Sequence, residues 1–130
     1  MQDVLVPVSP GELLDKITIL RIKSQRITDA TKLANVRHEL ALLERTWSEA
    51  VPGAAALAAH ERRLEEINAK LWDVEDQLRE LEAAKTFDAK FIELARAVYY
   101  TNDERAAVKK KINLALGSQL VEEKSYQQYS

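Results

Sequence analysis

The residues best able to do chemistry in this chain interrupt an apolar pattern in its last third. Positions 91, 94, 98, 102, 105, 109, 112 and 116 follow the spacing of one helix face, and both ends of this series are apolar. The central positions hold Asn102, Arg105 and Lys109. A cation on a buried face must be paired or must bind an anion, because an unpaired buried charge costs several kcal/mol. The pattern therefore predicts a basic polar pocket for a phosphate, a carboxylate or a sugar-linked anion.

Two structural interpretations of the same residues stay open. Residues 101–104 read Thr-Asn-Asp-Glu, which is a capping box, so the helix could restart there and turn its polar residues outward. Arg105 and Lys109 could instead extend from the edge of a bundle to water. In either case these residues would be structural and would bind no ligand.

A helix near the N-terminus could add cations to the pocket. Lys16 and Lys23 lie seven residues apart, so they share a helix face and could join Asn102, Arg105 and Lys109 in binding an anion. The competing interpretation is that these lysines are solvated. In that case the same helix would hold an ion pair between Asp15 and Arg26.

No other group of residues resembles a reactive site. The chain has no cysteine, and its two histidines, His38 and His60, have no second ligand at metal-binding spacing. Glycine-rich phosphate loops and nucleophile motifs are also missing from the sequence. We therefore predict no catalytic residue, no metal site and no cofactor, which favours a protein that is not an enzyme.

Composition restricts the partners and the location. The formal net charge of −2 gives no reason to expect a nucleic-acid partner, because phosphate binding needs a basic excess. No apolar run approaches the roughly 20 residues that span a bilayer. The opening residues lack the basic and apolar regions of a signal peptide. We expect a cytoplasmic protein without a membrane span.

Prolines and glycines mark where the helices must end. The six of them occur in three places, which are residues 7–11, residues 52–53 and Gly117. The stretches between them are rich in good helix formers. We predict one all-α domain over residues 1–130, an antiparallel helical bundle with helices at about 10–27, 30–50, 54–85 and 88–116. Residues 4–8 should be extended, and residues 119–126 could form a second extended segment that pairs with them.

Two of these helices carry apolar residues at alternating spacings of three and four. The second has them at 33, 36, 40, 43 and 47, and the third continues the pattern from 57 to 81. Such spacing is typical of coiled-coil-like packing. We predict that these two helices form a long antiparallel hairpin beyond which the third helix extends. Trp72 lies off this stripe, which indicates a contact with another helix or with a second copy.

Three segments resemble an uncharacterised bacterial family of short helical proteins. They are VPVSPGELLDKITILRIK at residues 6–23, NVRHEL at 35–40, and NDER at 102–105 followed by Lys109 and Asn113. The resemblance covers nearly the whole chain. It implies a helical fold and a surface-polysaccharide context, and it supplies no catalytic residue.

Two functions of different classes fit these observations. The first is a self-associating adaptor, a homodimer that could also bind a partner protein. The two-faced first helix, the overhanging third helix and Trp72 motivate it, because such surfaces usually pack against a neighbour. The second is a small helical enzyme or ligand-binding protein that acts on an anionic metabolite or a phosphosugar. We favour the first.

Overall fold

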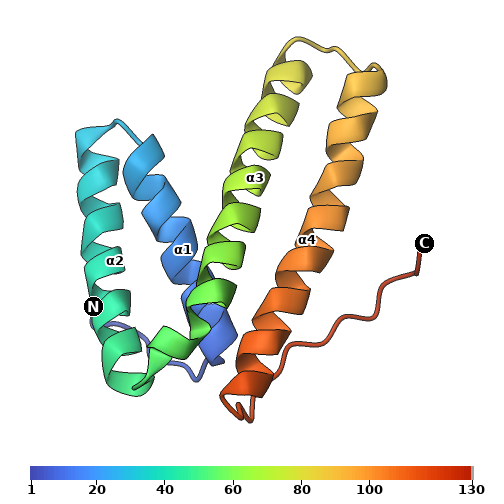
Figure 1. Cartoon of the computed structure of the whole chain (residues 1–130). Helices are drawn as coiled ribbons and strands as arrows, with labels where there is room; N and C mark the ends of the chain where they lie inside the picture. The colour runs from blue at the N-terminus through green and yellow to red at the C-terminus, as the bar shows by residue number, and fades with distance from the viewer. Residues whose placement is uncertain (130) are drawn as a thin grey trace.

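The chain folds into long helices joined by short turns (Figure 1). The computed structural model describes residues 1–129, and within this range it contains no strand. Its elements are α1 (Pro10–Arg26), α2 (Ala30–Ala50), the 3₁₀ turn η1 (Ala54–Leu57), α3 (Ala58–Ala83) and α4 (Ala89–Ala115). The predicted all-α antiparallel bundle is confirmed. The main difference in bounds is that a 3₁₀ turn replaces the first residues of the predicted third helix.

Helix α1 begins where the sequence predicts. The Ser9 hydroxyl accepts a hydrogen bond from the Glu12 amide at 3.2 Å, and Pro10 occupies the first turn. The Glu12 carboxylate accepts a hydrogen bond from Lys109 on α4. The start of α1 is therefore tied to α4 as well as capped locally.

The predicted pairing of the second and third helices is wrong. Helix α2 packs on α1, and the long hairpin is formed by α3 and α4 (Figure 1). Residues 27–29 are enough to fold α2 back along α1, whereas Pro52, Gly53 and η1 carry the chain away from α2 before α3 begins. As a result, α2 is a peripheral helix, and none of its side chains is buried.

Helix α1 lies at the centre of the assembly. It contacts α2, α3 and α4, which explains why it is apolar on two faces. The main core cluster forms where α1 meets the other helices, and it consists of Leu14, Leu57, Leu64, Ile67, Leu71, Val108 and Ile112. Trp47 and Val51 at the end of α2 pack against the same cluster.

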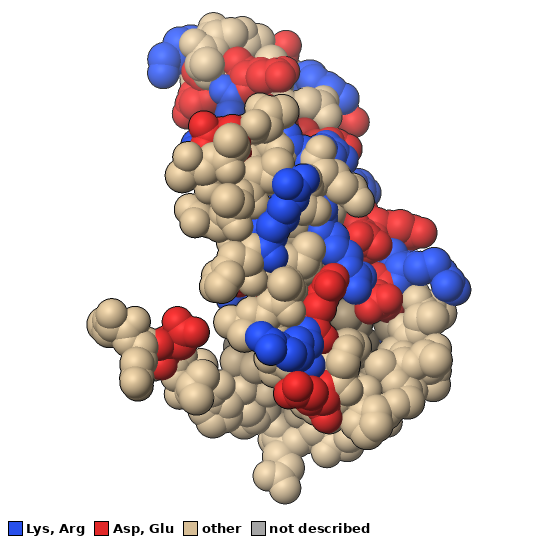
Figure 2. Space-filling model, turned by 90° about the vertical axis from the view of Figure 1, so that its left-hand side faces the viewer, with Lys and Arg blue, Asp and Glu red and all other residues tan. Residues whose placement is uncertain are grey.

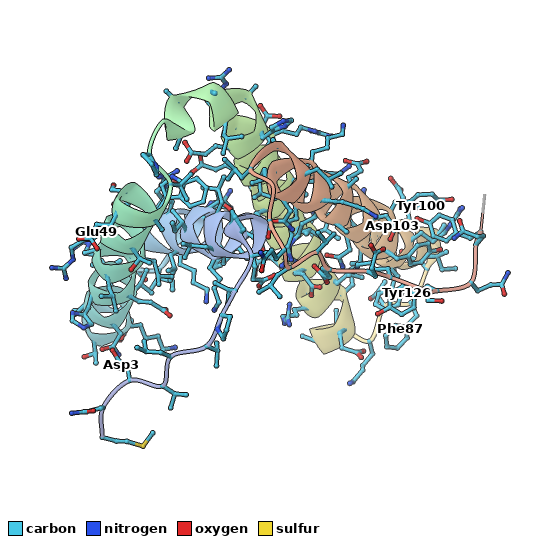
Figure 3. The ribbon with its side chains drawn as sticks, turned by 90° about the horizontal axis from the view of Figure 1, so that it is seen from below. Asp3, Glu49, Phe87, Tyr100, Asp103 and Tyr126 are labelled. Carbon is cyan, nitrogen blue, oxygen red and sulfur yellow. The ribbon has the colours of Figure 1, made fainter. Side chains whose placement is uncertain are left out.

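The α3–α4 hairpin extends beyond the α1–α2 pair (Figure 1). Arg26, the last residue of α1, contacts Asp73 in the middle of α3, so the second half of α3 lies past the end of α1. The two chain ends leave the bundle in opposite directions (Figures 1 and 3). Residues 4–8 and 119–126 therefore do not pair with each other, contrary to the expectation from sequence.

One glycine permits the close contact between α1 and α4. A Cβ atom at Gly11 would lie 2.5 Å from the Lys109 carbonyl oxygen and 2.9 Å from Asn113 Oδ1. The Gly11 amide donates a hydrogen bond of 2.7 Å to that same Asn113 oxygen. Only glycine allows the two backbones to approach this closely.

We predict that Gly11→Ala destabilises the fold by about 2–3 kcal/mol, because the added methyl group must push α1 away from the α4 backbone. Chemical denaturation measures the change in the free energy of unfolding. Gly53→Ala serves as the control. Gly53 has a φ of 76° but no atom within 4 Å of an added Cβ. Gly53→Ala should therefore lower the free energy of unfolding by only about 1 kcal/mol. An unchanged stability for Gly11→Ala would contradict the proposed close contact.

Candidate functional site

A buried carboxylate lies where α1 meets α4. Asp15 on α1 is only 1% exposed. Arg105 on α4 donates to both of its oxygens, from Nε at 2.9 Å and from Nη2 at 2.6 Å. This two-point contact is the strongest geometry available to an arginine and a carboxylate. The hydrogen bond to Asp15 raises the pKa of Arg105 above its ordinary value.

Helix α3 completes the surroundings of this carboxylate. The Asn68 side-chain nitrogen donates to Asp15 Oδ1 at 2.9 Å and to the Thr18 hydroxyl at 3.0 Å. The Thr18 hydroxyl donates in turn to the backbone oxygen of Asp15 at 2.8 Å. Asp15, Thr18 and Asn68 are all buried. One hydrogen-bonded polar cluster therefore joins three helices.

Lys109 forms a second group of ion pairs one turn along α4. Its Nζ lies 2.6 Å from Glu12 Oε2, 2.9 Å from Glu122 Oε2 and 4.0 Å from Asp15 Oδ2. Burial by itself would lower the pKa of Lys109, but its hydrogen bonds to Glu12 and Glu122 outweigh burial and raise it. The hydrogen bond from Lys109 lowers the pKa of Glu122. Lys109 is thus a charged amine that already has its counter-ions.

The structure separates the five residues that the sequence nominated as one site. Asn102, Arg105 and Lys109 face α1 together, and α4 is continuous through Thr101, so the helix does not restart there. Lys16 is exposed, and neither Lys16 nor Lys23 forms an ion pair within residues 1–129. The two N-terminal lysines therefore do not extend the α4 cluster.

The ion pair between Asp15 and Arg26, which the competing interpretation included, does not form. Asp15 pairs with Arg105, and Arg26 donates to Asp73 at 2.6 Å. Asp15 pairs with Arg105, although the two are far apart in the sequence, because α4 places Arg105 directly against this buried acid. Arg26 instead lies at the exposed end of α1. A sequence signal for this burial existed, since Asp15 shares the second apolar face of α1 with Ile19 and Ile22. No comparable signal indicated Asn68.

The C-terminal segment lies along α4 and completes the cluster. Besides Glu122 on Lys109, Glu123 lies 3.3 Å from the Nζ of Lys110. The Tyr129 hydroxyl donates to Asp103, and its ring packs edge-on against Tyr100 at a centroid distance of 4.7 Å. Figure 3 shows this side of the molecule, with Tyr126 near Tyr100 and Asp103. Side chains at residues 122, 123 and 129 thus contact α4.

The outer part of Arg105 is not buried. Together with Asn102 and Trp72, it lines a groove of about 380 Å³ between α1, α3 and α4. Trp72 is half-buried there, which accounts for a tryptophan outside the apolar stripe of its helix. Within the described residues, no group of three or more His, Asp or Glu side chains is placed to hold a metal ion.

We predict that Asp15→Asn destabilises the fold by about 2–4 kcal/mol, because it removes the buried charge that pairs with Arg105 and leaves the guanidinium without its counter-ion. The lower end of this range applies if Arg105, whose side chain is 29% exposed, turns to water. Thermal and chemical unfolding measure the loss. The matched control is Asp73→Asn, which weakens the exposed contact with Arg26 and should change stability by less than about 1 kcal/mol. Equal effects of the two variants would contradict a structural role for the cluster.

A second prediction concerns the docked C-terminal segment. The hydrogen bond to Asp103 raises the pKa of Tyr129 to about 12 from an ordinary 10.0. Docking favours the neutral phenol, so it is complete below pH 10 and is lost as the pH rises through the raised value. Tyrosinate absorbance should show one tyrosine with a raised pKa, which Tyr129→Phe removes and Asp103→Ala returns towards about 10. If all tyrosines titrate together in the unaltered chain, the docked contact is absent.

Comparison with known proteins gives one match. No curated protein and no solved structure matches the chain significantly. No helix within residues 1–129 combines the length and the apolarity needed to cross a membrane. The model of one protein family matches residues 4–129, and it is described as a family of unknown function (DUF6165). This match confirms the resemblance to an uncharacterised family, and the chain therefore belongs to DUF6165.

Proposed function

We propose that this protein is a helical module that self-associates as a homodimer through one uncharged end of its bundle. The antiparallel arrangement brings the start of α1, the α2–α3 turn and the end of α4 to the lower end in Figure 1. The three segments there, residues 4–11, 51–59 and 112–121, contain no charged side chain. This shared absence of charge is the observation that supports the proposal.

Many apolar side chains at this end are open to solvent. The exposed ones are Val4, Leu5, Val6, Val8, Leu114, Leu116 and Leu120, with exposed fractions from 38% to 90%. Figure 2 shows charged side chains over the upper and middle parts of one face, above a lower part that is largely uncharged. An uncharged apolar surface of this kind is typical of a protein–protein contact.

A second copy of the chain fits this surface better than a charged partner does. In a two-fold interface, identical side chains meet near the axis, so like charges would repel. The three segments at the lower end limit that repulsion because none of them carries a charged side chain. Its exposed valines and leucines amount to several hundred Å² of apolar surface, which approaches the roughly 800 Å² per partner of a standard interface.

The polar cluster is better explained as part of the scaffold than as a site for an anionic metabolite. Lys109 contacts three carboxylates, and Arg105 is paired with Asp15. An added phosphate at Lys109 would have to displace Glu12 or Glu122. This arrangement argues against the alternative function at Lys109 and leaves only the open side of Arg105 for a ligand.

The setting and the partner protein rest on the family resemblance alone. We propose a bacterial, cytoplasmic protein that works beside enzymes of surface-polysaccharide assembly, with no catalytic residue of its own. Removing the gene and analysing the polysaccharide on the cell surface tests this setting. An unchanged amount and chain length of the polysaccharide would contradict it.

We predict that the unaltered chain is a dimer at micromolar concentration and that Leu114→Glu makes it monomeric. A carboxylate in the apolar contact would have to lose its water on association. Analytical ultracentrifugation measures the mass. Ile92→Glu is the matched control, since Ile92 is 57% exposed and Leu114 is 65% exposed on the same helix, far from the lower end. A monomeric unaltered chain refutes self-association, and a dimer that survives Leu114→Glu refutes this surface.

A further inference from the structure

The groove between α1, α3 and α4 has the composition of a small-molecule site. The apolar residues that line it, which form its floor, are Ile19, Ile22, Leu71 and Trp72. The polar residues that line it are Asn68, Glu75, Asp76, Arg79, Asn102 and Arg105. Ile22 and Leu71 are only 3% and 8% exposed, so the floor belongs to the packed interior. A concave surface that combines apolar and polar side chains can hold a small organic ligand.

Arg105 keeps hydrogen-bonding capacity on the groove side. Its contact with Asp15 uses Nε and Nη2. The third nitrogen, Nη1, has only a long 3.4 Å contact with Asn102 Oδ1. An arginine has five N–H donors, so the two hydrogens of Nη1 are at most weakly used. Asp15 holds the Arg105 guanidinium in place, so ligand binding would not have to immobilise this side chain.

Asn102 supplies a second donor beside Arg105. The two residues are three positions apart on α4, which places them on the same helix face. The only bond of the Asn102 side chain within residues 1–129 is the one that its oxygen accepts from Arg105, so its amide nitrogen is free to donate. A guanidinium nitrogen and an amide nitrogen side by side match the two oxygens of a carboxylate.

The surrounding charges select the kind of anion. Asp15 already neutralises Arg105. Glu75, Asp76 and Arg79 line the same groove, and Arg79 is paired to Glu75 at 2.7 Å, so the charge of Arg79 is used as well. A phosphate with two negative charges would be repelled by these carboxylates. A singly charged carboxylate needs only hydrogen bonds and can place an apolar body on the floor of the groove. The indole of Trp72 offers that body a flat, apolar contact.

We propose that this groove binds a monoanionic organic acid, whose carboxylate accepts hydrogen bonds from Arg105 and Asn102 while its apolar or aromatic body packs on Trp72. The site excludes Lys16, Lys23 and Lys109, which the sequence grouped with Asn102 and Arg105. It lies away from the uncharged lower end, so its occupancy does not depend on self-association.

The test uses the full chain and the two tryptophan indole N–H signals in an NMR spectrum, assigned with Trp72→Phe. The probe is 3-phenylpropionate, and its neutral amide, 3-phenylpropionamide, is the matched ligand control. We expect the acid to shift the Trp72 signal saturably, with a millimolar or tighter dissociation constant, while the Trp47 signal stays in place. The amide should bind at least tenfold more weakly. No shift of the Trp72 signal, or equal binding of the acid and the amide, overturns the proposal.

Variants of Asn102 test whether the ligand carboxylate binds beside this residue. Asn102→Asp preserves an acceptor for Arg105 but adds a negative charge where the ligand carboxylate would lie, so it should weaken binding at least tenfold. Asn102→Ala, which only removes the donor, should weaken it severalfold and covers the case in which Asn102→Asp folds poorly. Lys16→Ala is the control and should bind like the unaltered chain. Full affinity in both Asn102 variants, or a loss in Lys16→Ala equal to theirs, overturns the assignment.

Discussion

The fold depends on one buried negative charge. Asp15 is placed where α1, α3 and α4 meet, so its burial is stabilising only if every neighbouring polar group is satisfied. Arg105, Asn68 and Thr18 provide those partners, one or more from each helix. The cluster therefore fixes how far the helices slide along one another, which apolar contacts alone would leave less well defined. Gly11 then lets the α1 and α4 backbones approach closely enough for the hydrogen bond to Asn113.

A chain of charges connects this cluster to the C-terminal segment. Lys109 lies within reach of Glu12, Asp15 and Glu122, so the start of α1, the end of α4 and the segment after α4 share one cation. Tyr129 adds a contact further along α4.

The proposed dimer surface and the proposed ligand groove both lie outside the packed core. The core is packed around α1, and α2 remains peripheral with no buried side chain. At the lower end, uncharged segments from three parts of the chain meet and leave valines and leucines exposed. Higher up, where α1 packs against α3 and α4, the side chains leave the groove beside Trp72. Self-association and ligand binding therefore involve separate parts of the molecule.

The sequence by itself determined the helices, and the tertiary structure decided their partners. Proline, glycine and capping residues act over a few positions, so the start of α1 at Ser9 and the turn at Gly53 could be predicted locally. The 3–4 spacing of Leu33, Leu40 and their neighbours showed that α2 packs on a helix, but that spacing is the same for any partner, which is why α3 was predicted in place of α1. The pairing of Asp15 with Arg105 joins residues 90 positions apart. Such a contact depends on the arrangement of three helices in space, and no local pattern in one sequence contains that information.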